Sequence, residues 1–513
     1  MSEIETKFPA VTLRVTDSTT YVIGRLTSDI YKEFKKTLEY KDPEATWRVT
    51  KQKDWDGYVT AVCYNEKWCK CSIKKDGVHF PTGLYSRAVD FFRAYCVPVN
   101  VSDERSSFES NKIAIGVTPS LEFRDYQSDI VEKAAKSQRG LIKVATGGGK
   151  TAIGSGIIAK IGVSPFIFYV TSQDLLRQAK SELERFLSIN NAPMEVGVIG
   201  GGKCDIRDVN IMTIQTAIRA LGEKFHKFDD EEEPEEISAE MKERYGVIAN
   251  LVHSAKGMIC DEVQHWAANT CQVIADHSYN ARFRFGLSAT PWRDMGDDLL
   301  IDACFGKMIA EINASFLIRK GILVKPTIYF VHTRKRFSDD EIAYATAYKE
   351  GIVQNEERNL MIANIAQNMV KQGRHVLILA KHIEHGDTLE SMIPDSVFLN
   401  GSHGAKVRQK HIDQMRIKKA PITIATSIFD EGVDVKPLDG LVLAGSGKSQ
   451  TRALQRIGRV IRSFEDASTG FIKRDAYIVD FHDNMKYMLG HSRARRRIYE
   501  TEPEFVIKDF KGT

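Results

Sequence analysis

Three glycines precede Lys150 in the run ATGGGKT, which extends from Ala145 to Thr151. The run follows an apolar segment that we expect to be a strand, and it precedes TAIGSGIIAKI, which we expect to be a helix. Glycines let backbone N–H groups turn inward around phosphate oxygens, and the N-terminus of the next helix adds partial positive charge. The Lys150 ammonium would reach the β and γ phosphates of ATP, and the Thr151 hydroxyl would bind Mg²⁺. The predicted phosphate loop consists of Thr146, Gly147, Gly148, Gly149, Lys150 and Thr151.

Two adjacent carboxylates, Asp261 and Glu262, end the apolar segment GMICDE (257–262). At the carboxyl end of a strand beside a phosphate loop, Asp261 can hold Mg²⁺ and Glu262 can orient or deprotonate the attacking water. An isolated Asp-Glu pair is more often a pair of exposed acids at a strand end. Because this pair follows a phosphate loop, we predict that Lys150, Asp261 and Glu262 are catalytic.

A third group of polar residues occurs in QRIGRVIR, where Gln455, Arg459 and Arg462 are spaced i, i+4 and i+7. This spacing predicts that they share one face of a helix, and the apolar residues between them give that helix a buried side. An arginine brought from a second domain to the γ-phosphate stabilises the charge of the transition state. The alternative is a solvated basic helix.

These residues need a scaffold, and the sequence predicts parallel sheets. Short apolar runs alternate with amphipathic helical segments from about residue 118 onward, as in sheets covered by helices on both faces. The first series of expected strands is 140–146, 166–172, 209–214, 257–262 and 283–290, and the second is 375–381, 396–402, 422–427, 439–445 and 476–481. The chain is therefore predicted to be α/β, with two tandem parallel-sheet domains at 118–323 and 324–513.

Residues 1–117 differ in composition from the rest of the chain and are rich in aromatic residues and lysine. Alternating stretches such as YVTAVCY predict small antiparallel strands, and 86–95 has the spacing of a helix that packs on them. We expect a small α+β N-terminal domain, followed by a polar linker at 101–112. The acidic run at 229–236 is expected to be a solvated insertion.

The amino-acid composition excludes several classes of protein. The chain has 513 residues, 42% of them hydrophobic and 27% charged, which excludes a disordered or collagen-like chain. The net charge of +4 permits nucleic-acid binding without requiring it. No signal segment and no apolar run long enough to span a bilayer occur in the sequence, so we expect a cytoplasmic protein without a membrane partner.

With these residues placed, the chain resembles the superfamily 2 helicases over about residues 118–490, which implies that the two α/β domains are RecA-like. The resemblance implies that Arg124 and Gln127 read adenine, that ATGGGKT is motif I, and that DEVQH and SAT are motifs II and III. It implies that ATSIFDEGVDV (425–435) is motif V and that QRIGRVIR is motif VI. Nucleic-acid contacts are then expected from Thr171, Gln173, Thr213, Gln215 and Thr426, coupling from Gln264, His265, Ser288 and Thr290, and further nucleotide contacts from Gly432 and Asp434.

Within that superfamily, LSATPWRDMGDD and ASFLIRKGILVKP resemble the XPB-like branch, including the UvsW-type helicases of bacteriophages. Trp55-Asp56-Gly57 followed by FPTGL (80–84) is similar to the N-terminal domain of the UvsW type. The resemblance implies an ATP-dependent helicase or translocase on branched DNA, in recombination, repair and replication-fork processing. A monomer is expected, acting in the host cytoplasm if the protein is viral.

Several alternatives stay open on the sequence alone. An RNA helicase of the same fold has the same motifs, and the motor subunit of a restriction nuclease would need an additional acidic site. The basic cluster Arg493, Arg495, Arg496 and Arg497 is either a DNA-binding patch or a solvated helix end. A strand-separating wedge is not evident, because the candidates Trp47, Trp55 and Trp68 are better explained as core residues of a small sheet.

Overall fold

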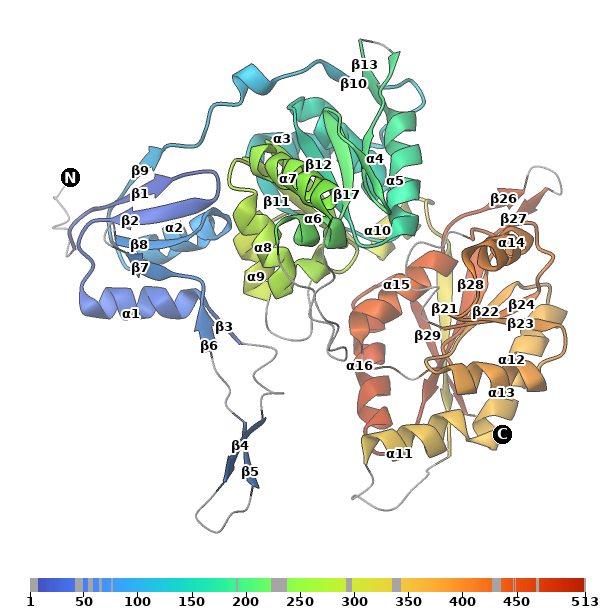
Figure 1. The fold of residues 1–513 in the computed structure, drawn as a ribbon. Helices are drawn as coiled ribbons and strands as arrows, with labels where there is room; N and C mark the ends of the chain where they lie inside the picture. Colours follow the sequence, from blue (N-terminus) through green and yellow to red (C-terminus); the bar gives the residue numbers. More distant parts are fainter. Residues whose placement is uncertain are drawn as a thin grey trace. The chain divides into compact units, whose positions relative to one another are not determined.

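The computed structural model describes residues 8–41, 49–53, 59–63, 67–74, 77–190, 192–222, 238–291, 298–334, 343–426, 435–445, 447, 449–466 and 470–511. The chain forms two compact units (Figure 1). The first contains Met1–Val144 and Gly149–Glu311, and the second contains Ala145–Gly148 and Ile312–Thr513. The domain boundaries predicted from the sequence stay a prediction.

The N-terminal part of the first unit is a sheet of mixed direction. Its strand order is β7-β8-β2-β1-β9, and β1 pairs antiparallel with β2 but parallel with β9. The strands are β1 (Val11–Val15), β2 (Thr19–Ile23), β7 (Ser72–Lys74), β8 (Gly77–Pro81) and β9 (Val99–Asp103). Short two-stranded ladders lie outside this sheet: β3 (Glu39–Lys41) with β6 (Lys67–Cys69), and β4 (Val49–Lys53) with β5 (Val59–Cys63).

Two helices, α1 (Ser28–Thr37) and α2 (Tyr85–Ala94), cover this sheet through a shared apolar core. The helix predicted at 86–95 is therefore confirmed. The prediction of a linker at 101–112 is wrong at its start, because Val101–Asp103 belongs to β9 and pairs with β1. Sequence reasoning missed this strand because its second half, Val101-Ser102-Asp103, continues into the polar run 104–107, which resembles a loop.

The N-terminal domain packs directly on helix α9 (Asp298–Phe305) of the same unit. A Cβ atom at Gly83 would lie 2.2 Å from the Asp302 carbonyl oxygen, so only glycine permits this approach. The Arg87 guanidinium forms an ion pair of 3.0 Å with the Asp302 carboxylate. The apolar core of the N-terminal domain also includes Leu299 and Ala303. This domain is thus an integral part of the first unit.

The rest of the first unit is an eight-stranded sheet, ordered β16-β15-β17-β12-β18-β19-β11-β20. Its strands are β11 (Arg139–Val144), β12 (Phe166–Val170), β15 (Gly197–Gly200), β16 (Lys203–Asp205), β17 (Val209–Thr213), β18 (Gly257–Asp261), β19 (Phe283–Ser288) and β20 (Met308–Ile312). The helices of this sheet, besides α9, are α3 (Asp125–Ser137), α4 (Lys150–Ile161), α5 (Gln173–Phe186), α6 (Ile214–Ala220), α7 (Ala239–Ser254) and α8 (Asn269–His277). A small separate sheet joins β10 (Ile115–Val117), β13 (Leu187–Ile189) and β14 (Ala192–Pro193).

The second unit has a seven-stranded sheet, ordered β23-β24-β22-β25-β28-β21-β29, in which every pairing is parallel. The strands are β21 (Lys325–His332), β22 (Val376–Leu379), β23 (Ser396–Leu399), β24 (Ile422–Ala425), β25 (Gly440–Val442), β28 (Asp475–His482) and β29 (Val506–Lys511). The helices are α10 (Ala314–Arg319), α11 (Tyr344–Tyr348), α12 (Glu356–Lys371), α13 (Ile383–Met392), α14 (Ala405–Arg416), α15 (Gln450–Val460) and α16 (Met488–Glu500). A small ladder joins β26 (Glu465–Asp466) and β27 (Phe471–Ile472).

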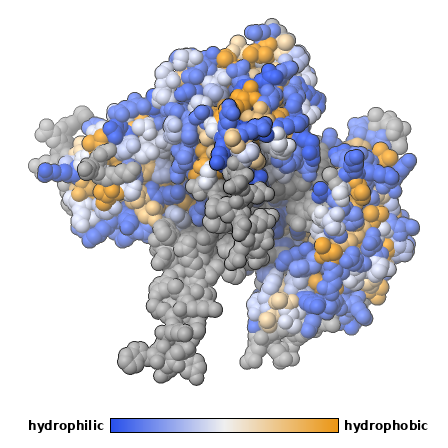
Figure 2. Space-filling model, viewed as in Figure 1, coloured by the Kyte–Doolittle hydropathy of each residue, from blue (hydrophilic) through white to orange (hydrophobic). Residues whose placement is uncertain are grey.

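Both series of predicted strands are confirmed, and so is the fold class of two α/β sheets after a small α+β domain. Hydrophilic residues cover most of the described surface on the face in Figure 2, with scattered apolar residues between them. Among the described residues, none of the helices combines the length and apolar character that crossing a bilayer requires. The predicted acidic insertion at 229–236, together with Trp47 and Trp55, lies outside the described residues.

Candidate nucleotide and nucleic-acid sites

The predicted phosphate loop connects β11 to α4, as the sequence indicated. Gly147 and Gly149 have φ angles of 88° and 83°, in the left-handed region that favours glycine. Gly149 is also the N-cap residue of α4, and its carbonyl oxygen accepts the first helical hydrogen bond, from the Ile153 N–H at 3.0 Å. Helix α4 therefore directs its N-terminal N–H groups toward the loop, which suits an anion such as a phosphate.

Gln127 lies directly against this loop. A Cβ atom at Gly149 would lie 2.4 Å from the Gln127 amide nitrogen, so the glycine is needed for this contact. The Gln127 side chain is 3% exposed, and its carbonyl oxygen accepts a hydrogen bond of 2.9 Å from the Arg124 backbone N–H at the start of α3. The two residues predicted to read adenine are thus adjacent, and one of them contacts the phosphate loop.

The two acids at the end of β18 surround the Lys150 ammonium. Lys150 Nζ donates to Glu262 Oε1 at 2.8 Å and lies 3.6 Å from Asp261 Oδ1. Burial raises the pKa of Asp261, and the positive charge of Lys150 opposes that effect. Glu262 has a φ of 50°, and its backbone N–H donates to Asp261 Oδ1 at 2.9 Å. A left-handed conformation at a residue with a long side chain is strained, and such strain is concentrated at functional sites.

Hydrogen bonds continue from Glu262 to the end of β19. Gln264 Nε2 donates to Glu262 Oε2 at 2.9 Å, and Ser288 Oγ donates to Gln264 Oε1 at 2.6 Å. The Thr290 backbone N–H donates to Ser288 Oγ at 2.9 Å. With the contact between Lys150 and Glu262, the structure thus joins five residues of three separate motifs in one connected chain. His265 is exposed in the short 3₁₀ helix η3 (Val263–Ala267).

The predicted arginine helix is α15, but it is shorter than expected. Gln455 and Arg459 lie in α15, which ends at Val460. The prediction that Arg462 shares this helix face is wrong, because Arg462 forms an isolated β-bridge with Leu323. The Val324 backbone N–H donates to the Ile461 carbonyl oxygen at 2.8 Å, and this pairing ends the helix.

The second unit also contains the first residues of the phosphate loop. A Cβ atom at Gly458 would lie 2.6 Å from Thr146 Cβ, so α15 approaches the loop at a position that only glycine permits. A Cβ atom at Gly147 would lie 2.9 Å from a Leu323 methyl group and 3.6 Å from Arg462 Cγ. The loop residues therefore pack against the segment that carries the predicted arginines.

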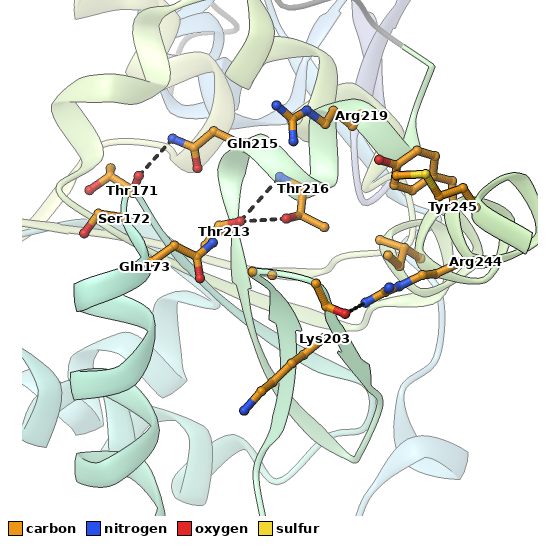
Figure 3. Close-up of a pocket in the computed structure, with 15 residues that line it drawn as sticks. Thr171, Ser172, Gln173, Lys203, Thr213, Gln215, Thr216, Arg219, Arg244 and Tyr245 are labelled. Atoms are coloured by element: carbon orange, nitrogen blue, oxygen red, sulfur yellow. Dashed lines mark hydrogen bonds between the residues drawn. The ribbon is translucent and has the colours of Figure 1, made fainter. Parts of the chain in front are cut away.

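A pocket of about 430 Å³ in the first unit contains four of the five predicted nucleic-acid residues (Figure 3). It is lined by Thr171, Ser172, Gln173, Gly200, Gly201, Gly202, Lys203, Thr213, Gln215, Thr216, Arg219, Met241, Arg244, Tyr245 and Ile248. This lining has three basic side chains and no acidic one. Its charge therefore suits a polyanion.

The predicted residues differ in how they contribute to this pocket. Gln173 is exposed, whereas Thr213 is 1% exposed and caps α6 by accepting a hydrogen bond from the Thr216 N–H at 3.4 Å. Gln215 donates from its amide to the Thr171 carbonyl oxygen at 2.9 Å. Thr213 and Gln215 thus build the wall, and Gln173 faces the solvent. Thr426 is buried at the end of β24 in the second unit.

Sequence reasoning missed the glycines and all three cations of this pocket. Gly200, Gly201 and Gly202 all have positive φ angles, and the Gly202 carbonyl oxygen accepts a hydrogen bond from Arg244. A Cβ atom at Gly201 would lie 2.6 Å from Oε1 of the Gln173 side chain. Three consecutive glycines after an apolar run were a usable signal of a turn that approaches a ligand closely.

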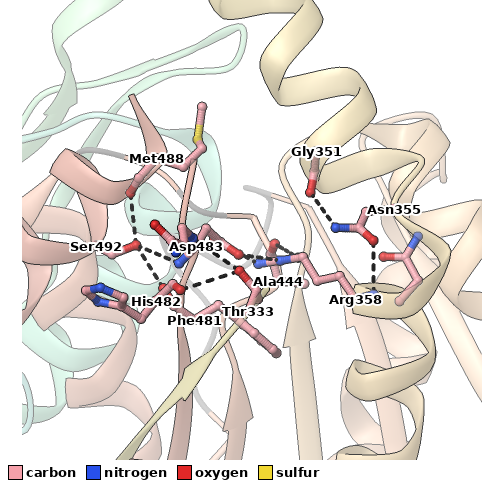
Figure 4. A network of polar contacts seen from close by, with 12 residues as sticks. Thr333, Gly351, Asn355, Arg358, Ala444, Phe481, His482, Asp483, Met488 and Ser492 are labelled. Carbon is pink, nitrogen blue, oxygen red and sulfur yellow. Dashed lines mark hydrogen bonds and ion pairs between the residues drawn. The ribbon is translucent and has the colours of Figure 1, made fainter. Parts of the chain in front are cut away.

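A second missed feature is a buried polar network in the second unit (Figure 4). Arg358 Nε donates to Asp483 Oδ1 at 2.8 Å, and its Nη1 donates to the Ala444 carbonyl oxygen at 2.9 Å. The two charged side chains are 1% and 0% exposed. Removing one partner of such a buried pair costs about 3–5 kcal/mol, because the other charge is left uncompensated. The network joins α12 to the loop before α16.

The C-terminal basic cluster is partly structural. Arg495 is 3% exposed, and its Nη2 lies 2.7 Å from an Asp480 carboxylate oxygen. Arg496 pairs with Glu500 at 3.1 Å and with Asp509 at 2.7 Å. Arg493 and Arg497 are exposed on α16. Two of the four arginines therefore hold α16 in place. Gly432 and Asp434, predicted to contact the nucleotide, lie outside the described residues.

Two protein-family models match this chain, one in each of the two large α/β sheets. Residues 120–293 match the family described as the res subunit of type III restriction enzymes, and residues 356–464 match the helicase conserved C-terminal domain. A chain of Halobacterium salinarum named Rad25 is 27% identical over 370 residues, which cover 71% of this chain and 55% of that one. The ATP-dependent DNA helicase uvsW of Enterobacteria phage T4 is 22% identical over 501 residues, which cover 89% of this chain and 90% of that one.

The chain spans less than two thirds of the length of the first curated relatives that it matches. A solved fragment from Vibrio vulnificus, described as an HsdR subunit of a type I restriction enzyme, has the same fold. It superposes with a TM-score of 0.53 at 17% identity and covers 76% of this chain and 68% of that one. Together with the connected motifs of the first unit, these matches identify the chain as a superfamily 2 helicase of the branch that includes the XPB, Rad25 and UvsW proteins.

Proposed function

We propose that this chain is an ATP-driven DNA helicase or translocase that acts on branched DNA. The observation that carries the proposal is the chain of hydrogen bonds from Lys150 through Glu262 and Gln264 to Ser288. It connects the residue that would contact the γ-phosphate to the end of a different strand, so a change at the nucleotide can be transmitted. The names of the similar proteins, a DNA 3'-5' translocase XPB2 and an ATP-dependent DNA helicase, support DNA as the substrate.

ATP would bind at the N-terminus of α4, with its phosphates against the N–H groups of the glycine loop. Arg124 and Gln127 would hold the base, and Lys150 would leave Glu262 to bind the β and γ phosphates. Glu262 would then be available to orient the attacking water. Gln455, Arg459 and Arg462 would stabilise the charge that develops on the γ-phosphate. The Gly458–Thr146 approach supports this role, since it brings α15 against the loop.

The donor set also suits Mg²⁺, which prefers hard oxygen ligands. Thr151 is the second residue of α4, and the Asp261 carboxylate lies 3.6 Å from the Lys150 ammonium. We infer that these two oxygens would hold the ion. When bound, Mg²⁺ would neutralise negative charge on the phosphates.

One strand of DNA would bind along the basic pocket of the first unit, with Lys203, Arg219 and Arg244 near its phosphates. Gln173 is the first residue of α5, and Thr171 lies just before the N-cap Ser172; the N-terminal N–H groups of this helix are suited to a phosphate. Thr426 would contribute from the second unit. Contacts of this kind are independent of sequence, as a motor that moves along DNA requires. We also propose that the protein acts as a monomer.

The decisive test measures ATP turnover and strand separation on matched substrates. Purified protein is given single-stranded DNA, a fork, a Holliday junction, a flap, a blunt duplex and a structured RNA. We expect DNA to stimulate ATP hydrolysis and the fork and junction to be unwound fastest, with Lys150→Ala inactive on all. Equal rates on the blunt duplex would contradict the preference for branches, and stimulation by RNA alone would indicate the RNA helicase alternative.

A second candidate, the motor of a restriction nuclease, is favoured by the family description of residues 120–293. Such a motor needs a separate acidic site that holds a metal. Within the described ranges, no group of three or more His, Cys, Asp or Glu residues could hold a metal ion. Incubating the purified chain with Mg²⁺, ATP and plasmid DNA distinguishes the two, since a helicase leaves the DNA intact and a nuclease cleaves it.

A further inference from the structure

Exposed aromatic rings gather at one end of the second unit, where α11 meets the start of α16. The Tyr344 ring centroid lies 5.6 Å from that of Tyr487, at an interplanar angle of 74°, and 5.9 Å from that of His491. Tyr344 and Tyr487 are 38% and 39% exposed, so neither ring is a core residue. We call Tyr344 and Tyr487 the aromatic platform. Rings exposed in this way are the usual contact surface for flat, unpaired bases.

Lysine side chains flank the same rings. Lys381 Nζ lies 5.7 Å from the Tyr344 ring centroid and 4.9 Å from that of Tyr348, and Lys486 Nζ lies 5.1 Å from that of Tyr487. Aromatic faces and positive charges therefore alternate over a short distance. This combination matches a nucleic-acid strand, whose bases stack while its phosphates require cations.

The platform is built on a rigid base, although its halves are far apart in sequence. Beneath it, Tyr348, Ile352, Val353, Met485 and Met488 form a small apolar cluster of their own. The buried Arg358–Asp483 pair of Figure 4 fixes the start of the loop that carries Lys486 and Tyr487. Ser492 Oγ, which bonds to the Phe481 and Met488 carbonyl oxygens, fixes the other side of that loop. The rings are thus held in place before any ligand arrives.

The backbone at the platform is also unusual. Tyr487 has a φ of 64° and a ψ of −50°, a positive-φ conformation that is rare for a bulky aromatic residue. The turn after α11, η4 (Lys349–Val353), is a π-helix. Both features are uncommon in ordinary scaffolds and are concentrated at binding sites, where the surrounding structure maintains them. Here the apolar cluster and the buried ion pair maintain them.

We propose that the aromatic platform stacks on bases of single-stranded DNA while Lys381 and Lys486 bind the neighbouring phosphates. Duplex DNA does not fit this site equally well, because its base faces are covered by their neighbours in the stack. The platform would hold the unpaired bases of a separated strand. It would thereby add a contact to DNA bases, which none of the sequence motifs predicted. This inference rests on the proposed action on DNA.

The test combines a ring-deleting variant with a ring-preserving one. The double variant Tyr344→Ala, Tyr487→Ala removes both rings, whereas Tyr344→Phe, Tyr487→Phe keeps them and removes only the hydroxyls. The probe is a thymidine oligonucleotide of about 20 nucleotides that contains 2-aminopurine, whose fluorescence falls when it stacks on an aromatic ring. We expect the alanine variant to bind about tenfold or more weakly and to lose the quenching. The phenylalanine variant should retain both properties.

Thermal unfolding of each variant shows whether the second unit stays folded, and Lys381→Ala gives a second, milder measurement. We expect Lys381→Ala to reduce the salt dependence of oligonucleotide binding while leaving the quenching intact. The inference would be overturned if the folded alanine variant kept wild-type affinity and quenching. It would also be overturned if that variant lost duplex and single-strand binding equally, with no change in quenching. Failure of the proposed function is a different result, since wild-type protein would then show no ATP hydrolysis stimulated by DNA.

Discussion

The Gln264 amide nitrogen donates a hydrogen bond of 2.9 Å to the Glu262 carboxylate. The Gln264 carbonyl oxygen accepts another, of 2.6 Å, from the Ser288 hydroxyl. An amide can donate and accept at the same time, which an ionised carboxylate cannot do. Gln264 therefore joins the acid that we expect to orient water to the strand end that carries Ser288 and Thr290.

We predict that Gln264→Glu lowers ATP turnover in the presence of DNA by about tenfold or more, since a hydrogen bond to a charged group contributes about 1.5–3 kcal/mol. The new carboxylate would repel Glu262 and could not donate to it. Gln264→His keeps one donor and one acceptor and is the matched control, which we expect to retain most of the activity. Steady-state ATP hydrolysis, with and without single-stranded DNA, is the measurement. Equal stimulation by DNA in both variants would show that this contact does not couple the two sites.

A second prediction concerns Glu262 itself. Glu262→Gln removes the carboxylate that would orient water, and we expect ATP turnover to fall about 100-fold or more while DNA binding stays measurable. Glu311→Gln is the matched control. The Glu311 side chain is 54% exposed, and within the described part of the chain its ion pair is with Lys143, at 2.8 Å. An exposed pair of this kind contributes about 0–1 kcal/mol. Near-normal turnover in Glu262→Gln would refute its assignment.

The regular elements were predictable because their signal is local. A run such as Phe166–Val170, apolar at every position, leaves no exposed face and so predicts a strand covered on both sides. The phosphate loop and its acids were equally readable, because each lies at the end of such a strand. The local sequence pattern gave a wrong prediction at Arg462. There the helix ends early, because Arg462 pairs with Leu323, which is distant in the sequence.

The basic pocket could be predicted only in part. Thr171 and Gln215 belong to recognisable motifs, whereas Lys203 and Arg244 reach the same pocket from β16 and α7. No periodicity relates such segments, since the fold alone brings them together. The same reason hides the pairing of Arg358 with Asp483, which lie 125 residues apart.

The third prediction concerns the basic pocket. If Lys203 and Arg219 each bind one phosphate, replacing either with alanine should reduce the slope of log affinity against log salt by about 0.7 for a single strand. Affinity should fall by a similar factor for all DNA sequences, because phosphates carry no sequence information. Lys242→Ala is the matched control, since Lys242 is exposed on α7 but does not line the pocket. Unchanged slopes for both variants would exclude the pocket as the path of the strand.

The fourth prediction concerns stability and pH. His385 is buried, and its Nε2 lies 2.9 Å from Asn359 Oδ1, a hydrogen bond that the neutral ring donates. Burial, and then the positive charge of Arg358, lowers the pKa of His385 to about 3. Between that value and the unfolded pKa of about 6.5, the unfolded chain binds a proton that the folded chain does not. The free energy of unfolding must therefore decrease as pH falls through this range.

From pH 6.5 to pH 5.5 this single group should remove about 1 kcal/mol of stability from the second unit. His385→Gln keeps a donor for Asn359 but cannot be protonated, so its free energy of unfolding should change by about 1 kcal/mol less over the same interval. Urea titrations followed by circular dichroism at the two pH values give the comparison. His403→Gln, at a partly exposed histidine, controls for the loss of an imidazole elsewhere in the unit. If His385→Gln and the wild type lose equal stability, His385 is not the group whose protonation destabilises the fold.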